Sequence, residues 1–328
     1  MMRRLAWVAA VVVCATVVAT ALAGCTGSAE HLTTSPWPPA DRERPHIPVE
    51  PAPLSDDPFP EREPAPTPEP EPGEPTPAPS PGPAPPPAPS PSECASLSNT
   101  KRGWWYQASG AGSVPTIPSD IASIIQRQGA LWRVPTREKV IYLTFDQGYE
   151  AGFTGRILDT LRSKDVKATF FLSGSYVRDE PGLVRRMASE GHLVGNHTQT
   201  HPSLPSLAGD ADAFAEEYRS VERAYREVTG ESLARLERPP RGEYSERTLC
   251  MVRSLGYTSV MWSFAHRDWL LDDQPPVDVT YQRIIDGAHP GAIMLLHSVS
   301  SSNTQALPRA IDELRSRGYR FATLDEAR

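Results

Sequence analysis

The sequence lacks the two features that most directly indicate a nucleic-acid or nucleotide partner. Lys and Arg are nowhere gathered into a basic patch, and the 328 residues carry a formal net charge of −7. Because nucleic-acid binding depends on such a patch, we expect no nucleic-acid partner. A Gly-rich phosphate loop between a strand and a helix is also missing. Its absence counts against an open, doubly wound nucleotide-binding sheet, the main alternative among α/β folds.

Cysteine is scarce, with four residues in the whole chain. Cys14 lies in an apolar N-terminal run and would be removed with it, and Cys25 follows that run directly. Cys94 and Cys250 remain, and an exported protein could join them in a disulfide. The sequence alone leaves open whether these two cysteines meet.

The first 25 residues match a bacterial lipoprotein signal. A basic start, Met1–Arg4, precedes the apolar run Leu5–Ala23, and Leu22-Ala23-Gly24-Cys25 has the small residues that precede a cleaved and acylated cysteine. A signal anchor or a transmembrane helix is the alternative, because the run is long. We expect residues 1–24 to be a signal peptide and Cys25 to carry the lipid. The protein would then be extracytoplasmic and anchored to the bacterial cell membrane.

One long segment is dominated by proline. From Ser35 to Pro91 the chain holds 24 of its 36 prolines, interleaved with Glu, Ala, Thr and Ser. Such a composition cannot bury a core and favours extended polyproline II. We therefore expect residues 25–95 to be a disordered spacer. Residues 96–138 would form an N-terminal extension packed on the folded domain of residues 139–328.

The folded domain alternates between short apolar runs and amphipathic stretches with helical spacing. Seven strands with a helix between each successive pair predict an α/β fold whose sheet is a barrel of about seven parallel strands. The predicted strands are Val140–Asp146, Ala168–Ser173, Leu193–Gly195, Ala234–Glu237, Ser259–Ser263, Ala292–His297 and Phe321–Leu324. The predicted helices are Thr154–Lys164, Gly182–Glu190, Phe214–Val228, Ser245–Leu255, Thr280–Ile285 and Thr304–Arg317.

The first of these strands ends in Thr144-Phe145-Asp146-Gln147-Gly148. It brings the Asp146 carboxylate to the C-terminal edge of the sheet, where reactive groups collect in α/β folds. Gly148 allows a sharp turn immediately afterwards. Gln147 is the unusual residue, because a neutral amide stands where a second carboxylate would make a metal-binding pair.

Two histidines follow the third predicted strand. Because His197 and His201 are four residues apart, we expect them to lie on one side of a helical turn and to reach one metal ion. Two ordinary polar loop residues would be the alternative. Their position just after a strand, like that of Asp146, favours metal binding.

Three later strand ends add a cation, a carboxylate and a histidine. Arg238 begins R-P-P-R-G, a stiff turn in which Gly242 allows close backbone approach, and it could pair with a carboxylate. Asp268 could orient a histidine, and the neighbouring Trp269 could stack on a sugar. His297 ends an apolar run. With an Asp partner it would be a general acid, and without one it could be a core residue.

Taken together, these segments resemble the polysaccharide deacetylase family, with its NodB-homology domain. The resemblance spans about Lys139 to Leu324 and implies a distorted (β/α) barrel. It also implies metal-assisted hydrolysis of an N-acetyl or O-acetyl group on a carbohydrate. Five motifs carry it in order: T-F-D-Q-G (144–148), H-T-Q-T-H-P (197–202), R-P-P-R-G (238–242), D-W (268–269) and L-L-H (295–297).

The resemblance implies a role for each motif residue. Asp146 would be the base that activates water, and Arg238 would hold it. His297, oriented by Asp268, would be the acid for the leaving amine. His197 and His201 would be metal ligands, with Gln147 as a weak third ligand. The backbone N–H of Arg241 would donate to the oxyanion. Tyr149 and Trp269 would contact the substrate.

Two residues depart from the wider family and resemble one of its branches. Most members have Asp at the position of Gln147 and Tyr or Phe at that of Arg241. The delta-lactam-biosynthetic de-N-acetylases have T-F-D-N-G-Y-E and R-P-P-R-G, and they act on N-acetylmuramic acid in peptidoglycan. Arg241 suits a sugar that bears a lactyl carboxylate, because a guanidinium binds a carboxylate with two hydrogen bonds. We therefore expect peptidoglycan glycan strands as the substrate.

Gln147 also bears on the metal and on the alternatives. Its amide oxygen is neutral and so a weaker ligand than Asp, and zinc, manganese and cobalt all accept imidazole. One alternative is an N-acetylglucosamine or chitin-type deacetylase that lost its metal carboxylate. Another is a non-catalytic glycan-binding module, against which stands the retention of both a base and an acid.

Overall fold

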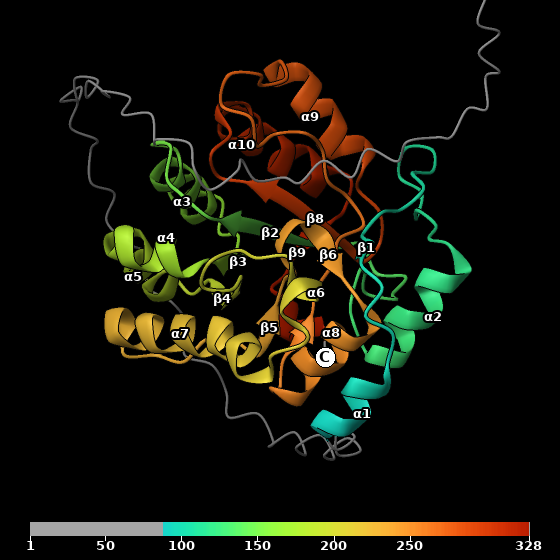
Figure 1. The fold of residues 1–328 in the computed structure, drawn as a ribbon. Coiled ribbons are helices and arrows are strands. Elements are labelled where there is room, and N and C mark those ends of the chain that lie inside the picture. Colours follow the sequence, from blue (N-terminus) through green and yellow to red (C-terminus); the bar gives the residue numbers. More distant parts are fainter. Residues whose placement is uncertain (1–87, 328) are drawn as a thin grey trace, which may run out of the picture. The chain divides into compact units, whose positions relative to one another are not determined.

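A curled parallel sheet organises the computed structural model, which describes residues 88–327 (Figure 1). The strand order is β7-β5-β4-β3-β2-β8, β9 pairs with β2, and all these pairings are parallel. The predicted α/β fold with about seven parallel strands is confirmed. The strands are β2 (Val140–Gln147), β3 (Thr169–Leu172), β4 (Leu193–Asn196), β5 (Leu236–Glu237), β7 (Thr258–Ser259), β8 (Ala292–His297) and β9 (Arg320–Phe321).

All six predicted helices are present within a few residues of their expected ends. They are α3 (Thr154–Ser163), α5 (Pro181–Ser189), α7 (Ala211–Thr229), α8 (Glu246–Ser254), α9 (Val277–Asp286) and α10 (Ser301–Ser316). Four further helices were not predicted, namely α1 (Pro91–Ser96), α2 (Ser119–Gln128), α4 (Gly174–Asp179) and α6 (Leu204–Leu207). Between residues 88 and 327, no helix combines the length and hydrophobicity needed to cross a membrane.

The central strand β2 is buried on both sides, and its residues alternate between two cores. Ile141, Leu143 and Phe145 pack with residues of the helices that surround the sheet (Figure 1). Val140 and Tyr142 pack instead with apolar residues of the neighbouring strands inside the curled sheet. Because side chains alternate along a strand, Thr144 and Asp146 share the inner face with Val140 and Tyr142. The polar site is therefore built at the C-terminal end of the barrel interior.

The predicted strand Ser259–Ser263 is much shorter in the structure. Only Thr258 and Ser259 form β7, with isolated bridges at Val260 and Phe264. The N-terminal extension forms some of the backbone hydrogen bonds of this segment instead. The Leu131 N–H donates to Ser259 O, and the Met261 N–H donates to Leu131 O. The barrel is thus distorted at the position where Leu131 of the N-terminal extension supplies hydrogen bonds that a neighbouring strand of the sheet would otherwise supply.

Glu150, which follows the T-F-D-Q-G motif, supports the start of α3. Its Oε1 accepts hydrogen bonds from the backbone N–H groups of Phe153 (2.7 Å) and Thr154 (3.2 Å). Its Oε2 accepts one from the Tyr176 hydroxyl (3.1 Å). N–H groups in the first turn of a helix have no partner within the helix, so this carboxylate stabilises both α3 and the turn after β2.

The N-terminal extension is joined to the barrel by a disulfide and a short strand pair. Cys94 in α1 is bonded to Cys250 in α8, which answers the question that the sequence left open. Strand β1 (Arg102–Gly103) pairs antiparallel with β6 (Glu243–Tyr244). The predicted end of the spacer at residue 95 lies inside α1, which begins with a Ser90 capping box. The predicted signal peptide, Cys25 and the spacer up to residue 87 lie outside the described residues.

Candidate active site

The predicted base and the predicted acid lie side by side. Strands β2 and β8 pair in parallel with Asp146 opposite His297, so both residues end their strands at the same edge of the sheet. Both side chains are almost fully buried. Each is held by a different partner, Asp146 by Arg238 and His297 by Asp268. The sheet register therefore brings together two groups that are 151 positions apart in the numbering of the chain.

Arg238 is completely buried, and each nitrogen of its guanidinium donates a hydrogen bond. Nη1 donates to Asp146 Oδ1 (2.7 Å) and Nη2 donates to Thr144 Oγ1 (2.8 Å). Nε donates to Val260 O (3.0 Å), and the guanidinium carbon lies 4.3 Å from the Phe171 ring centroid. A charge buried to this degree is tolerated only when it is paired and hydrogen-bonded. Arg238 thus orients Asp146 and depends on it.

His197 and His201 do meet, but not on a helical turn. Their ring centroids are 4.9 Å apart in an edge-to-face arrangement. They lie in a loop after β4 in which Thr198 (φ 67°) and His201 (φ 57°) are left-handed, so the predicted helical turn is wrong. The loop is stabilised by Asn196, whose Oδ1 accepts from the Thr198 N–H (2.8 Å), and by Thr198, whose Oγ1 accepts from the His201 N–H (3.1 Å).

The environment of both histidines favours their neutral form. Burial lowers the pKa of His197. Burial, followed by the charges of His197 and Arg241, lowers the pKa of His201 well below its usual value. The Nδ1 of His197 is 2.8 Å from Arg238 O, and since a carbonyl only accepts, Nδ1 carries the proton. Neutral imidazole is the form that binds a metal ion, and His197 Nε2 lies 3.8 Å from Asp146 Oδ2.

Gln147 decides how well the residues here fit a metal ion. Its amide nitrogen donates to Ser298 Oγ, which leaves Oε1 buried with no hydrogen-bond partner. Within residues 88–327, no cluster of three or more His, Cys, Asp or Glu side chains could hold a metal. The donors predicted from the sequence are two imidazoles and one amide oxygen, with no carboxylate among them. This set fits a divalent cation, but without the charge of a carboxylate ligand its affinity should be modest.

The contacts of His297 with Asp268 favour its protonated form. Its Nδ1 donates to Asp268 Oδ1 (2.7 Å), and its backbone N–H donates to Asp268 Oδ2 (2.9 Å). Burial opposes the positive charge, but the charge and hydrogen bond of Asp268 outweigh it, so the pKa of His297 is raised. The same pairing outweighs burial at Asp268, whose pKa is lowered. This arrangement is suited to a general acid near neutral pH.

Arg241 lies at the partly exposed rim in a constrained turn. Its backbone is left-handed (φ 59°, ψ 9°), which is uncommon for a residue other than glycine. The next residue must be glycine, because a Cβ on Gly242 would lie 2.8 Å from the Trp262 ring and 3.1 Å from Trp104. The backbone N–H of Trp104 also donates to Gly242 O (2.8 Å). The positive charge of Arg241 contributes to the lowered pKa of His201, after burial and His197.

The two predicted substrate contacts are also partly exposed. The Trp269 ring centroid lies 5.8 Å from that of His297, edge-on, so Trp269 borders the acid directly. Tyr149 follows the turn after β2, and burial raises the pKa of its hydroxyl. Asp146, His197 and His297 are therefore buried, whereas His201, Arg241 and Trp269 are partly exposed.

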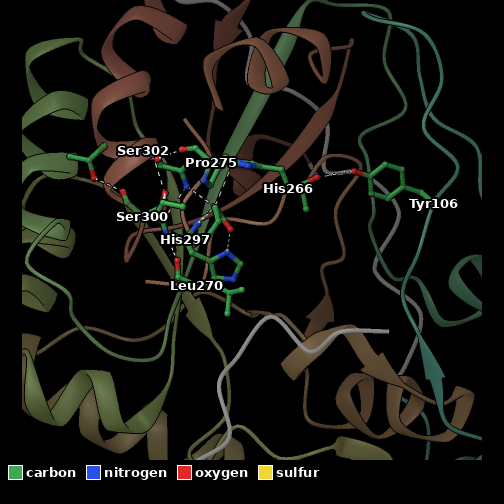
Figure 2. A network of polar contacts seen from close by, with 12 residues as sticks. Tyr106, His266, Leu270, Pro275, His297, Ser300 and Ser302 are labelled. Atoms are coloured by element: carbon green, nitrogen blue, oxygen red, sulfur yellow. Dashed lines mark hydrogen bonds and ion pairs between the residues drawn. The ribbon is translucent and has the colours of Figure 1, made fainter. Parts of the chain in front are cut away.

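Two buried residues near the acid were missed in the sequence. Asn303 Nδ2 donates to Asp268 Oδ2 (2.6 Å), and His266 Nε2 is 3.0 Å from Asn303 Oδ1. Figure 2 shows His266 and His297 in one polar network with Ser300 and Ser302, which belong to the start of α10. The only local indication was Ser-Ser-Ser-Asn, a typical helix start. Nothing in that pattern points to Asp268, which is 35 residues away.

Comparison with known proteins points to one family. The family model described as polysaccharide deacetylase matches residues 133–260. The chain is similar to the peptidoglycan-N-acetylmuramic acid deacetylase PdaA of Bacillus subtilis, with 39% identity over 234 residues, 71% of this chain and 88% of that protein. The solved structure of PdaA, a family 4 carbohydrate esterase, has a TM-score of 0.68 at 40% identity and covers 70% of this chain and 98% of that chain.

Two further relatives extend the comparison. The structure of a family 4 carbohydrate esterase from Bacillus anthracis has a TM-score of 0.60 at 38% identity, covering 71% of this chain and 98% of that one. A peptidoglycan-N-acetylglucosamine deacetylase of Bacillus cereus is 34% identical over 200 residues, 60% of this chain and 91% of that protein. The names of the characterised relatives thus specify two different sugars.

Proposed function

The chain belongs to the polysaccharide deacetylase family, and we propose that it removes the N-acetyl group from N-acetylmuramic acid in peptidoglycan. It is a carbohydrate N-deacetylase, a hydrolase of carbon–nitrogen bonds other than peptide bonds. One observation supports the reaction most strongly. A carboxylate held by Arg238 and an imidazole held by Asp268 lie opposite each other at the ends of neighbouring strands.

The two groups divide the proton transfers of amide hydrolysis. Asp146 Oδ1 is bound by Arg238, so Oδ2 accepts the proton of the attacking water. The water oxygen bonds to the acetyl carbon, and the backbone N–H of Arg241 can donate to the oxyanion that forms. His297 then gives its proton to the sugar nitrogen as the carbon–nitrogen bond breaks, which releases acetate and a free amine. Asp268 stabilises the charged imidazole that this step consumes.

We also propose that a divalent metal ion assists the reaction. His197 and His201 would hold it, with Gln147 Oε1 as the neutral third ligand, and zinc, manganese and cobalt all suit imidazole. When bound, the ion would polarise the acetyl carbonyl and lower the pKa of water. Gln147→Asp adds the missing carboxylate, so isothermal titration with Zn²⁺ should show affinity about 10-fold higher or more. Unchanged affinity would remove Gln147 from the ligand set.

Arg241 is the proposed basis for choosing the muramic sugar. Only that sugar carries a lactyl ether, and its carboxyl group, free or in amide linkage, would lie at the partly exposed rim where Arg241 is held in a fixed turn. Replacing Arg241 by Tyr should lower kcat/KM for a muramyl substrate with a free lactyl carboxylate by about 10-fold and leave a glucosaminyl substrate nearly unchanged. If wild type and Arg241→Tyr had the same ratio of kcat/KM for the muramyl and glucosaminyl substrates, this role of Arg241 would be rejected.

Acetate release separates the proposal from its alternative. Purified protein would be incubated with glycan strands and muropeptides, with added divalent metal or with chelator. Released acetate would be measured, and the sugar bearing the free amine would be identified by mass spectrometry. We expect the amine on the muramic residue. An amine on glucosamine would instead support the N-acetylglucosamine deacetylase alternative, and no acetate from any substrate would contradict both.

Finally, we propose that a lipid on Cys25 anchors the protein to the outer face of the cell membrane. This rests on the lipobox Leu22-Ala23-Gly24-Cys25 after an apolar run. Two acyl chains of a diacylglycerol suffice for stable anchoring. Wild-type protein should be labelled by a fatty-acid probe and sediment with membranes, whereas Cys25→Ala should be unlabelled. Equal labelling of both would rule out Cys25 as the lipid site.

A further inference from the structure

The carboxylate that orients the acid lies on a segment without regular structure. Asp268 belongs to residues 265–276, which form neither helix nor strand. A catalytic pair needs its geometry held to within a fraction of an ångström. Asp146 gains this from a strand and a buried guanidinium, whereas Asp268 must be held in another way.

The start of α10 supplies that support. Ser300 caps this helix, and its Oγ accepts from the Asn303 N–H (3.1 Å). The cap places the fully buried Asn303 side chain against the Asp268–His297 pair. Asn303 Nδ2 donates to Asp268 Oδ2 (2.6 Å) and to His297 O (3.2 Å). The Asn303 amide group therefore contacts both the Asp268 side chain, which orients the acid, and the backbone of His297, the acid itself.

A neutral histidine fixes which way the Asn303 amide faces. Both contacts to Asp268 and His297 need a donor, so the amide NH₂ faces them and Oδ1 faces His266 Nε2 at 3.0 Å. His266 Nε2 must then donate. Burial lowers the pKa of His266, and the charge of Asp268 raises it by a smaller amount, so the pKa is lowered overall. The imidazole is thus a neutral donor that opposes rotation of the amide.

Two more contacts join α10 to the same segment. Gln274 Nε2 donates to Asp268 O (3.0 Å), and Ser300 Oγ donates to Gln274 Oε1 (2.6 Å). Ser302 Oγ donates to Pro275 O, and Figure 2 shows Ser300, Ser302, Pro275 and His297 close together. The segment of Asp268 is therefore attached to the first turn of α10 at several points. Within that turn only Asn303 contacts the carboxylate, whose Oδ2 also lies 3.8 Å from His266 Nε2.

We propose that Asn303 is a positioning residue for the general acid, and that His266 keeps its amide in the productive orientation. Asn303 orients Asp268 and His297 without touching substrate. The proposal rests on the proposed role of His297 as the acid. Loss of the amide should lower kcat by about 10-fold and leave KM within about twofold, because substrate contacts are unchanged.

Asn303→Ala, Asn303→Asp and His266→Phe test the proposal, with Thr304→Val as control. Thr304 is the next residue of α10 and is also buried, but its hydroxyl donates only to Ser300 O. In Asn303→Asp the protonated acid can still donate to Asp268, whereas the ionised acid repels it. Its kcat relative to wild type should therefore recover several-fold from about pH 8 to about pH 5.5. Asn303→Ala should show no such recovery, and His266→Phe should lose about threefold.

A proton NMR measurement makes the result independent of substrate. The Nδ1–H of His297 donates to Asp268 at 2.7 Å and should give a low-field resonance that shifts or disappears in both Asn303 variants but not in Thr304→Val. Unchanged resonance in Asn303→Ala, or equal fractional loss of kcat for Asn303→Asp at every pH, would overturn the proposal. A shifted resonance in a protein that releases no acetate would uphold the positioning role and contradict the proposed function instead.

Discussion

The base and the acid of this site are held in two different ways. Asp146 lies on the central strand β2, and its partner Arg238 is the residue directly after β5, so both are fixed by the sheet and buried. His297 ends β8, but its partner Asp268 lies on an irregular segment that the start of α10 holds through Asn303. The pair Asp146–Arg238 therefore contributes directly to the stability of the fold. The pair His297–Asp268 is instead held by hydrogen bonds from outside the sheet. Changes on the two sides should differ in their effect on stability as well as on rate.

The largest effect should follow from Asp146→Asn. It removes the base and leaves the buried guanidinium of Arg238 without a counter-charge. Acetate release should fall by about 10⁴-fold, and the free energy of unfolding by about 3–5 kcal/mol. Denaturant titration measures the free energy of unfolding and an acetate assay measures the rate. Asp312→Asn, at an exposed position, is the control. A variant that is inactive yet as stable as wild type would break the proposed link between base and fold.

His297→Gln should be the milder change. The rate should fall by about 10²-fold because the leaving amine loses its proton donor. Asp268 would keep the donors from Asn303 and from the backbone of residue 297, so we expect the free energy of unfolding to fall by only about 1–3 kcal/mol. If the same denaturant titration found His297→Gln less stable than Asp146→Asn, the contrast between the two sides would be wrong.

A substrate with a better leaving group sharpens the contrast. An aryl acetate ester releases a phenolate, which needs no proton from the acid. With this probe His297→Gln should stay within about fivefold of wild type, whereas Asp146→Asn should remain strongly impaired because water must still be activated. Equal losses for the two variants on the ester would mean that His297 does more than protonate the leaving group.

The smallest effect concerns pH. The pKa of His297 is raised in the folded protein, because Asp268 outweighs the effect of burial. Its contribution to stability is therefore fully present below the unfolded-state pKa of about 6.5 and is lost as pH rises through the raised pKa. The kcat should fall over the same alkaline range, as the acid loses its proton. Unfolding and rate profiles should show both changes in wild type, and His297→Gln should show neither.

Regular elements were predictable because their signals are local. The continuous apolar run of β2 and the spacing of α3, α5, α7 and α10 lie in consecutive residues, and the structure has all of these elements. The predicted strand Ser259–Ser263 was mostly wrong because Leu131, from a distant segment, takes its hydrogen bonds. The helical turn for His197 and His201 was also wrong. Side-chain bonds from Asn196 and Thr198 favour a left-handed loop there over a helix.

By itself, the sequence determined which chemical groups end the strands, and hence the family and the reaction class. Only the tertiary structure decided how those groups are held. The parallel register of β2 and β8 places Asp146 beside His297, and burial makes Arg238 dependent on Asp146. Asn303 meets Asp268 only because the start of α10 packs on the irregular segment. Strand and helix patterns repeat every few residues and can be read along the chain, whereas contacts between distant segments exist only after the core has packed.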